Sequence, residues 1–423
     1  MTWLTTPAHH RWLESETDRL LAFGAASRDA RGGFGWLDEA GALDPDHDVE
    51  LWITCRMTHC FALAALMGRP GAAALVDHGL DALAGRLRDA EHGGWFAAVG
   101  ADGPTKDVKE AYGHAFVILA ASSALAAGRP GAADLLADAL AVHTERFWDE
   151  EVGMSREAFA RDWSEIEDYR GINANMHTVE AYMAAADVLG DKDLLHRALR
   201  IAEKAVHGFA AGNDWRLPEH FDADWHPLMA YNEDEPAHPF RPFGATIGHL
   251  FEWSRLTLQL AHSLEQSGLA CPEWMLPDAR ELYAAAVREG WNVDGAVGFV
   301  YTVDWEGRPV VRERMHWVSA EAIAAAAVLW QATRAAEYAE DYQRWWDYAG
   351  EHHLDLDGGS WWHELGTANE VSRTVWEGKA DIYHAVQATL IPRLPVSPAL
   401  AASLAAAFRA ATCLIASAIV SGS

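Results

Sequence analysis

Isolated titratable or aromatic side chains interrupt otherwise apolar helical stretches at a nearly regular interval. One series stands at positions 56, 114, 177, 249, 317 and 384, so that its members are 58 to 72 residues apart. A charged or titratable group in an apolar helix is costly unless it is paired or has a function. With their neighbours on the same stretches, the candidates are Arg56, Tyr112, His114, Asn173, His177, His249, Glu252, Trp317, Glu321 and His384. A lone buried His is usually a packed core residue, but six groups in register favour a shared site.

His249 and Glu252 are three residues apart and therefore share one face of a helix. A carboxylate beside an imidazole orients it and raises its pKa, which is typical of a general base. The same pair could bind a metal, but the HExxH spacing is absent and no Cys or Asp cluster accompanies it, so we expect no metal. His114 and Glu321 could support other site residues instead of meeting a ligand. We find no nucleotide-binding glycine motif and expect no cofactor.

Helical periodicity predicts the elements that must position these residues. The expected helices cover residues 10–27, 50–67, 72–88, 108–127, 131–148, 173–189, 191–210, 243–268, 276–290, 317–335, 337–353 and 380–392. Amphipathic stretches alternate with stretches that are apolar on every side. A helix apolar on every side is buried, whereas one with a polar face is peripheral, so an inner and an outer ring are predicted.

Internal repeats support this interpretation. The string Gly-Arg-Pro-Gly-Ala-Ala at 68–73 recurs at 128–133, where Gly ends one helix and Pro begins the next. Glycines followed by aromatic residues recur between outer and inner helices and predict short hairpins on one rim. Six helix pairs closing on themselves predict an all-α (α/α)6 barrel of twelve helices, in one domain over 1–423. Residues 397–423 would add a final helix or tail.

Composition limits the partners. The formal net charge of the 423 residues is −29, and Lys and Arg form no stripe, so we expect neither nucleic acids nor acidic membranes as partners. No apolar run is long enough to span a membrane, and the N-terminus lacks a signal pattern. The four scattered Cys fit a reducing compartment, so a cytoplasmic protein is expected. The 20 Trp and 21 His suit sugar faces and proton transfer.

Four strings resemble those of the N-acylglucosamine 2-epimerase superfamily. They are Tyr112–Phe116, Tyr169–His177, Gly248–Trp253 and Lys379–His384, in the same order. The pair His316-Trp317 is similar to the aldose–ketose isomerase branch, whereas the epimerase branches typically carry two aromatic residues there. The resemblance implies an (α/α)6 barrel that acts on the reducing end of a free monosaccharide without a redox cofactor.

The resemblance also implies roles. His384 would remove the proton from C2 and return it to C1 of a cis-enediolate, and His249, oriented by Glu252, would serve the oxygens or the opposite face. His177 would open the ring and Arg56 would hold the oxyanion. The substrate would be bound by Tyr112, Asn173, Arg241, His316, Trp317 and Glu321. D-Mannose and D-fructose are the expected pair, and a homo-oligomer is possible.

Other functions remain open. A sugar 2-epimerase acting on mannose, cellobiose or an N-acylglucosamine would use the same site, as would a sulfoquinovose isomerase. A glycoside hydrolase needs two carboxylates, which Glu252 and Glu321 could supply, although the inner positions are His-rich. A non-catalytic helical scaffold is disfavoured by the titratable groups in register.

Overall fold

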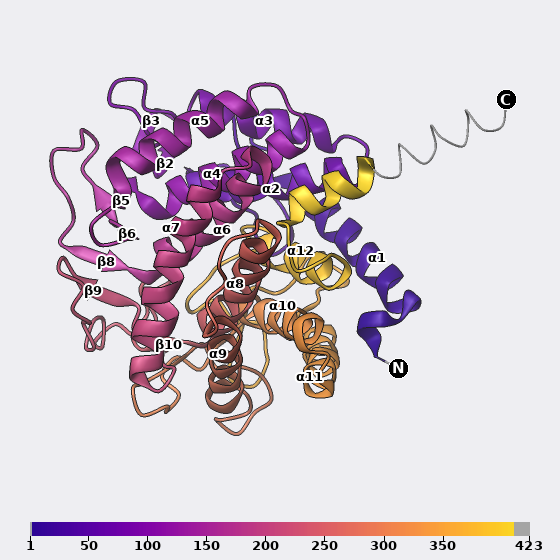
Figure 1. Ribbon diagram of the computed structural model, residues 1–423. Helices are drawn as coiled ribbons and strands as arrows, with labels where there is room; N and C mark the ends of the chain where they lie inside the picture. The colour runs from indigo at the N-terminus through magenta and orange to yellow at the C-terminus, as the bar shows by residue number, and fades with distance from the viewer. Residues whose placement is uncertain (1, 410–423) are drawn as a thin grey trace.

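A computed structural model describes residues 2–409 and contains a double ring of α-helices (Figure 1). The inner ring consists of α2 (Leu51–Leu66), α4 (Ala111–Ala126), α6 (Ile172–Leu189), α8 (Ile247–Gln266), α10 (His316–Thr333) and α12 (Tyr383–Leu390). The outer ring consists of α1 (Pro7–Gly24), α3 (Ala72–Ala84), α5 (Ala132–Val142), α7 (Lys192–Ala202), α9 (Met275–Gly290) and α11 (Ala336–Tyr348). The predicted (α/α)6 barrel is confirmed, with helix boundaries shifted by a few residues.

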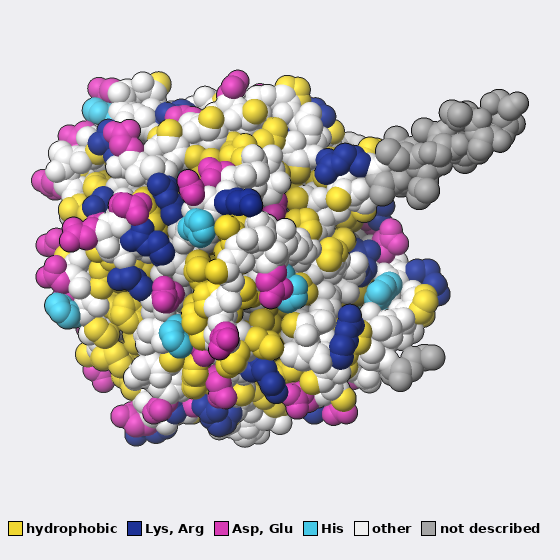
Figure 2. Space-filling model, viewed as in Figure 1, with side chains coloured by type: hydrophobic (Ala, Val, Ile, Leu, Met, Phe, Trp, Pro, Cys, Tyr) yellow, Lys and Arg dark blue, Asp and Glu magenta, His cyan; other side chains and the backbone are white. Residues whose placement is uncertain are grey.

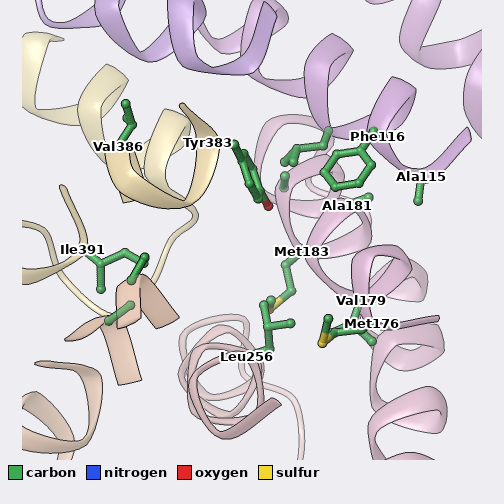
Figure 3. Close-up of a cluster of buried hydrophobic side chains, with 14 of the residues drawn as sticks. Ala115, Phe116, Met176, Val179, Ala181, Met183, Leu256, Tyr383, Val386 and Ile391 are labelled. Carbon is green, nitrogen blue, oxygen red and sulfur yellow. The ribbon is translucent and has the colours of Figure 1, made fainter. Parts of the chain in front are cut away.

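The alternation of apolar and amphipathic sequence produces the two rings. In α4 and α10 most residues are buried and none is exposed, whereas α7 and α11 bury one face each. Because the inner helices are apolar all round, they can contact both the outer ring and one another. Figure 3 shows part of this core, where Met183 of α6, Leu256 of α8 and Tyr383 of α12 point into the space between their helices.

The tight helix–helix corners occur where the repeated string predicted them. Gly71 and Gly131 have φ values of +82° and +77° and directly precede α3 and α5. L-residues with side chains rarely adopt this left-handed conformation, so glycine is needed at both turns. Each corner connects the C-terminal end of an inner helix to the next outer helix.

The rim at the N-terminal ends of the inner helices contains the predicted turns. The segments in which glycine precedes an aromatic residue form isolated antiparallel β-bridges, such as Arg28–Phe34, Arg88–Trp95 and Leu354–Trp361. Two local hairpins also form, β2–β3 (Ala98–Gly100, Gly103–Lys106) and β5–β6 (Trp148–Asp149, Met154–Ser155).

A second strand system on this rim was not predicted. The strand just before each of the first five inner helices, α2 to α10, pairs antiparallel with a strand in the next rim loop. The pairs are β1–β2 (β1, Val49–Glu50), β4–β7 (Lys109–Glu110, Ala158–Phe159), β8–β9 (Tyr169–Gly171, His220–Asp222), β10–β11 (Ala245–Thr246, Thr302–Val303) and β12–β13 (Arg314–Met315, Glu364–Leu365). Lys379 N donates to Leu37 O at 2.8 Å between the last loop and the first. These bonds fix the inner helix N-termini at a common level.

The C-terminal segment returns across the opposite end of the barrel. Residues 400–409 are helical, and Ala399 N donates to the Asp187 carboxylate at 2.7 Å. The predicted continuation to 423 lies outside the described residues. Within residues 2–409, no helix is long and apolar enough to cross a membrane. On the face seen in Figure 2, basic side chains are interspersed with acidic ones.

Candidate functional site

A cavity of about 700 Å³ opens at the rim, among the N-terminal ends of the inner helices. We call it the rim cavity. Its polar lining consists of Arg56, Tyr112, Asn173, His177, His249, Glu252, His316, His363, Asp381 and His384, and its larger apolar side chains are Trp52, Phe240, Tyr301, Trp317 and Trp376. Side chains from all six inner helices therefore converge on one space, as the register predicted.

His384 is held by a carboxylate that lies behind it. Its Nδ1 lies 2.8 Å from Glu321 Oε1, and Arg255 Nε donates to Glu321 Oε2 at 2.9 Å. An imidazole that donates from Nδ1 carries its lone pair on Nε2. Burial lowers the pKa of His384, although the Glu321 hydrogen bond opposes this, so the ring is neutral near pH 7. His384 can therefore act as a base.

His249 has a different carboxylate partner from the one predicted. Its Nδ1 lies 2.8 Å from Glu219 Oε1, from the segment just before β9. Glu252 instead accepts from Arg255 Nη2 at 3.3 Å. The expected orientation of His249 by Glu252 is therefore wrong, because Arg255, one turn further along α8, attracts that carboxylate. His249 still has the predicted form of a carboxylate-held imidazole.

Trp317 lies against both imidazoles. Its ring centroid is 5.1 Å from that of His249 and 5.6 Å from that of His384. The two bases thus lie beside the same indole in one cavity. An indole offers a flat apolar surface that suits the C–H face of a sugar ring.

Two buried carboxyl groups share Arg255 unequally. Burial and the nearby Glu321 carboxylate raise the pKa of Glu252 well above its usual range. For Glu321 burial acts in the same direction, but Arg255 and His384 hold its pKa below the usual range. Burial and the Glu321 charge thus favour the protonated form of Glu252, and its Oε2 is buried without a hydrogen-bond partner in the described chain. It can donate a proton or a hydrogen bond into the rim cavity.

Arg56 supplies the positive charge of the cavity. Its Nη1 donates to Asp381 at 3.1 Å and its Nη2 to the Tyr112 hydroxyl at 3.0 Å. The guanidinium also lies 5.1 Å from the Trp52 ring centroid. Burial disfavours its charge, but Tyr112, Asp381 and Tyr383 hold its pKa above the ordinary value. It stays protonated and can stabilise a developing oxyanion.

Asn173 and His177 stand one turn apart on α6. Asn173 Oδ1 is buried and finds no hydrogen-bond partner within residues 2–409, so the amide is available to a ligand. His177 Nδ1 lies 3.4 Å from Glu180 Oε2, and burial lowers the His177 pKa to about 4. His177 is thus a neutral imidazole at the cavity wall.

His316 forms a stacked pair that was not predicted. Its ring lies 3.9 Å from that of His363, at an interplanar angle of 14°. Burial, followed by the charge of His363, places the His316 pKa well below the usual value. His316 Nε2 is buried without a partner in the part of the chain that the structure describes, so it can bond a hydroxyl.

Three candidates do not line the rim cavity. Glu321 acts through His384, and His114 Nε2 accepts from Trp95 N at 3.1 Å, as a packed core histidine would. Arg241 donates to both Glu167 oxygens, at 2.8 and 3.0 Å, and stacks on Tyr169. Its neighbour Phe240 lines the rim cavity instead. Hydroxyl binding by Arg241 remains a prediction that would require release from Glu167.

Comparison with known protein families identifies the family of this chain. The family model described as N-acylglucosamine 2-epimerase matches residues 32–388. The chain belongs to the N-acylglucosamine 2-epimerase family.

Individual relatives agree with this assignment. A D-mannose isomerase of Thermobifida fusca is 53% identical over 405 residues, which cover 95% of this chain and 98% of the relative. Another, of Pseudomonas cannabina pv. alisalensis, is 51% identical over 404 residues, covering 96% and 97%. A solved D-mannose isomerase structure has a TM-score of 0.85 at 28% identity, covering 92% of this chain and 99% of that one.

Several site residues escaped the sequence analysis. Glu219, His363 and Trp376 lie on rim loops, where no helical period marks them. Asp381 stands inside the string Lys379–His384 that carries the resemblance, three residues before His384, so its position was an available signal. Phe240 lies between two prolines, a segment with no periodic pattern.

A single methyl group at Gly248 should disturb both bases. A Cβ at this position would lie 2.1 Å from the Trp317 ring, which cannot move without shifting its contacts to His249 and His384. We expect Gly248→Ala to lower kcat/KM by about 10-fold or more, since small misplacements in an active site are costly. Steady-state kinetics would measure this. Gly212→Ala is the control, because a Cβ there meets no atom within 4 Å and activity should be unchanged.

Proposed function

We propose that this protein is an aldose–ketose isomerase that interconverts D-mannose and D-fructose. The observation that carries the proposal is the pair of carboxylate-held imidazoles, His249 and His384, placed around Trp317 in one cavity. The high identity to relatives named D-mannose isomerase over nearly the whole chain supports the choice of sugar.

The site can perform the required proton transfers. After ring opening, His384 Nε2 takes the proton from C2, and the electrons move to O1 to give a cis-enediolate. The same proton, delivered to C1, yields the ketose, while a proton moves from O2 to O1. Arg56 would stabilise the enediolate charge, and Glu252 in its protonated form, which burial favours, would donate to a substrate oxygen. His177 is placed to assist ring opening.

Epimerisation at C2 is the second candidate. His249 lies on the same indole as His384, so a proton returned to C2 from His249 would give the epimer. Glycoside hydrolysis is less well supported, because Glu252 and Glu321 are both tied to Arg255 and Glu321 does not line the rim cavity.

The proposed reaction uses neither a metal nor a nucleotide. Two groups could hold a cation by distance alone, His177–Glu180–Glu252 and Glu252–Glu321–His384. In both, Glu252 is already paired with Arg255, whose guanidinium supplies a fixed positive charge. We propose that the protein acts on free sugar in the cytoplasm, alone or as a homo-oligomer.

Chelator-treated protein and D-mannose in D₂O, followed by NMR, would test the proposal. We expect fructose as the main early product, with no added metal or nucleotide. Glucose as the main early product would transfer the protein to the epimerases. If mannose gave no product but sulfoquinovose or cellobiose were turned over, that sugar would take the place of mannose as the proposed substrate.

A further inference from the structure

A second cavity of about 570 Å³ lies below the rim cavity, toward the C-terminal ends of the inner helices. We call it the lower cavity. Its polar walls include His59, Ser122, Glu180, Arg255 and Gln387. Residues 396 and 399–402 of the C-terminal segment form its outer wall. The proposed reaction uses none of this space.

One layer of ionisable side chains separates the two cavities. His177 and Glu180, 3.4 Å apart, stand three residues apart on α6, and the first lines the rim cavity while the second lines the lower cavity. Glu252 and Arg255, 3.3 Å apart on α8, are divided between the cavities in the same way. These side chains therefore form both the base of the rim cavity and the adjoining wall of the lower cavity.

The lower cavity contains buried polar atoms without partners. His59 Nε2, Ser122 Oγ and Gln387 Oε1 have no hydrogen-bond partner among the described residues, and all three residues line this cavity. Buried polar atoms in native proteins are bonded to protein or to ordered water. A cavity of this size with several polar partners can hold water.

Carboxyl groups connect the lower cavity to the proposed base. Ligand atoms of His384, Glu321 and Glu252 lie within 4.8 Å of one another, as do those of His177, Glu180 and Glu252. Glu252 belongs to both groups, so the series runs from His384 to Glu180. The Glu180 carboxylate in turn accepts from Gln387 Nε2 at 3.0 Å and from the Tyr383 hydroxyl.

We propose that the lower cavity holds a water cluster that exchanges protons between solvent and the catalytic layer while a sugar fills the rim cavity. This inference rests on the proposed function. A proton that His384 has taken passes to the Glu252–Glu180 layer and on to a water, and a solvent proton returns by the same groups, so that no net charge moves. Ala399, Leu400 and Ala402 of the outer wall are partly exposed, which brings the cavity close to the surface.

Solvent deuterium incorporation tests the route. In D₂O, wild-type protein should place deuterium at C1 of part of the ketose. Glu180→Gln keeps hydrogen-bonding groups but cannot carry a proton, so incorporation per turnover should fall several-fold. A purely structural role for Glu180 would change kcat without changing this fraction. Met183→Leu, which conserves volume in the same cavity, is the control and should match the wild type.

Three results would overturn the inference. The first is wild-type ketose without deuterium at C1, and the second is Glu180→Gln with wild-type incorporation. The third is a high-resolution crystal structure in which no water bonds His59 Nε2, Ser122 Oγ or Gln387 Oε1. The crystal structure does not depend on enzymatic activity, so it tests whether the water cluster exists even if the protein does not catalyse the proposed reaction. A protein that isomerises no aldose but has a hydrated lower cavity would contradict the proposed function alone.

Discussion

Replacement of His384 by Asn should reduce kcat for mannose isomerisation by about 10²–10⁴-fold, the usual contribution of a positioned acid–base group. Asn can still accept a hydrogen bond from the substrate but cannot take a carbon-bound proton. The ring it replaces is buried, neutral and held at Nδ1 by Glu321, which leaves Nε2 as the proton acceptor. Initial-rate kinetics with a sensitive fructose assay would measure the loss.

The chain contains a matched control. His114 stands at the corresponding position of another inner helix and is equally buried, but its ring nitrogens contact Trp95 N and Glu110 O instead of the rim cavity. We expect His114→Asn to lower the unfolding temperature and to leave kcat near the wild-type value. His384→Asn with near wild-type kcat and unchanged circular dichroism would show that His384 is not the base.

Much of the fold could be predicted because it depends on patterns that the chain repeats. Ala-rich inner stretches such as 111–126 and 316–333 are apolar all round, and only a buried helix satisfies that pattern. The Gly-Arg-Pro-Gly corners fixed the helix pairs. The strands that link successive rim loops were missed because each is only two or three residues long and depends on a partner far away in the sequence, as Val49 does on Val99.

The site residues, like the fold, include some that the sequence could predict and others that it could not. Residues on inner helices, including Arg56, His177, His249 and His384, could be found because helical spacing brings them to one level. Their partners could not, since a hydrogen bond such as His249–Glu219 joins a helix to a loop. The incorrect Glu252 assignment has this origin: sequence spacing showed a shared face but not the competing Arg255.

Among the substitutions considered, loss of the Arg255 ion pairs has the largest expected effect on the free energy of unfolding. Arg255 is 2% exposed, and its guanidinium bonds both Glu252 and Glu321. Removing one partner of a buried ion pair leaves an uncompensated buried charge and typically costs about 3–5 kcal/mol. We therefore expect Arg255→Met to lower the free energy of unfolding by that amount at pH 7, measured by urea denaturation.

Arg344 is the matched control for this substitution. It pairs with Asp341 at the same three-residue spacing on outer helix α11, but its side chain is 52% exposed. Exposed pairs contribute about 0–1 kcal/mol, so Arg344→Met should change stability little. Equal losses in the two variants would show that the Arg255 pair is screened by water and is not the buried network described above.

The pH dependence of the Arg255→Met effect identifies the group responsible. Arg255 holds the pKa of Glu321 below its unfolded value of about 4.3, so the pairing stabilises the folded state above that pH. As the pH falls through the folded pKa, Glu321 is protonated and the contribution is lost. The stability difference between wild type and Arg255→Met should therefore shrink below about pH 4. A difference that stays constant from pH 7 to pH 3 would assign the loss to packing of the long Arg255 side chain instead of its charge.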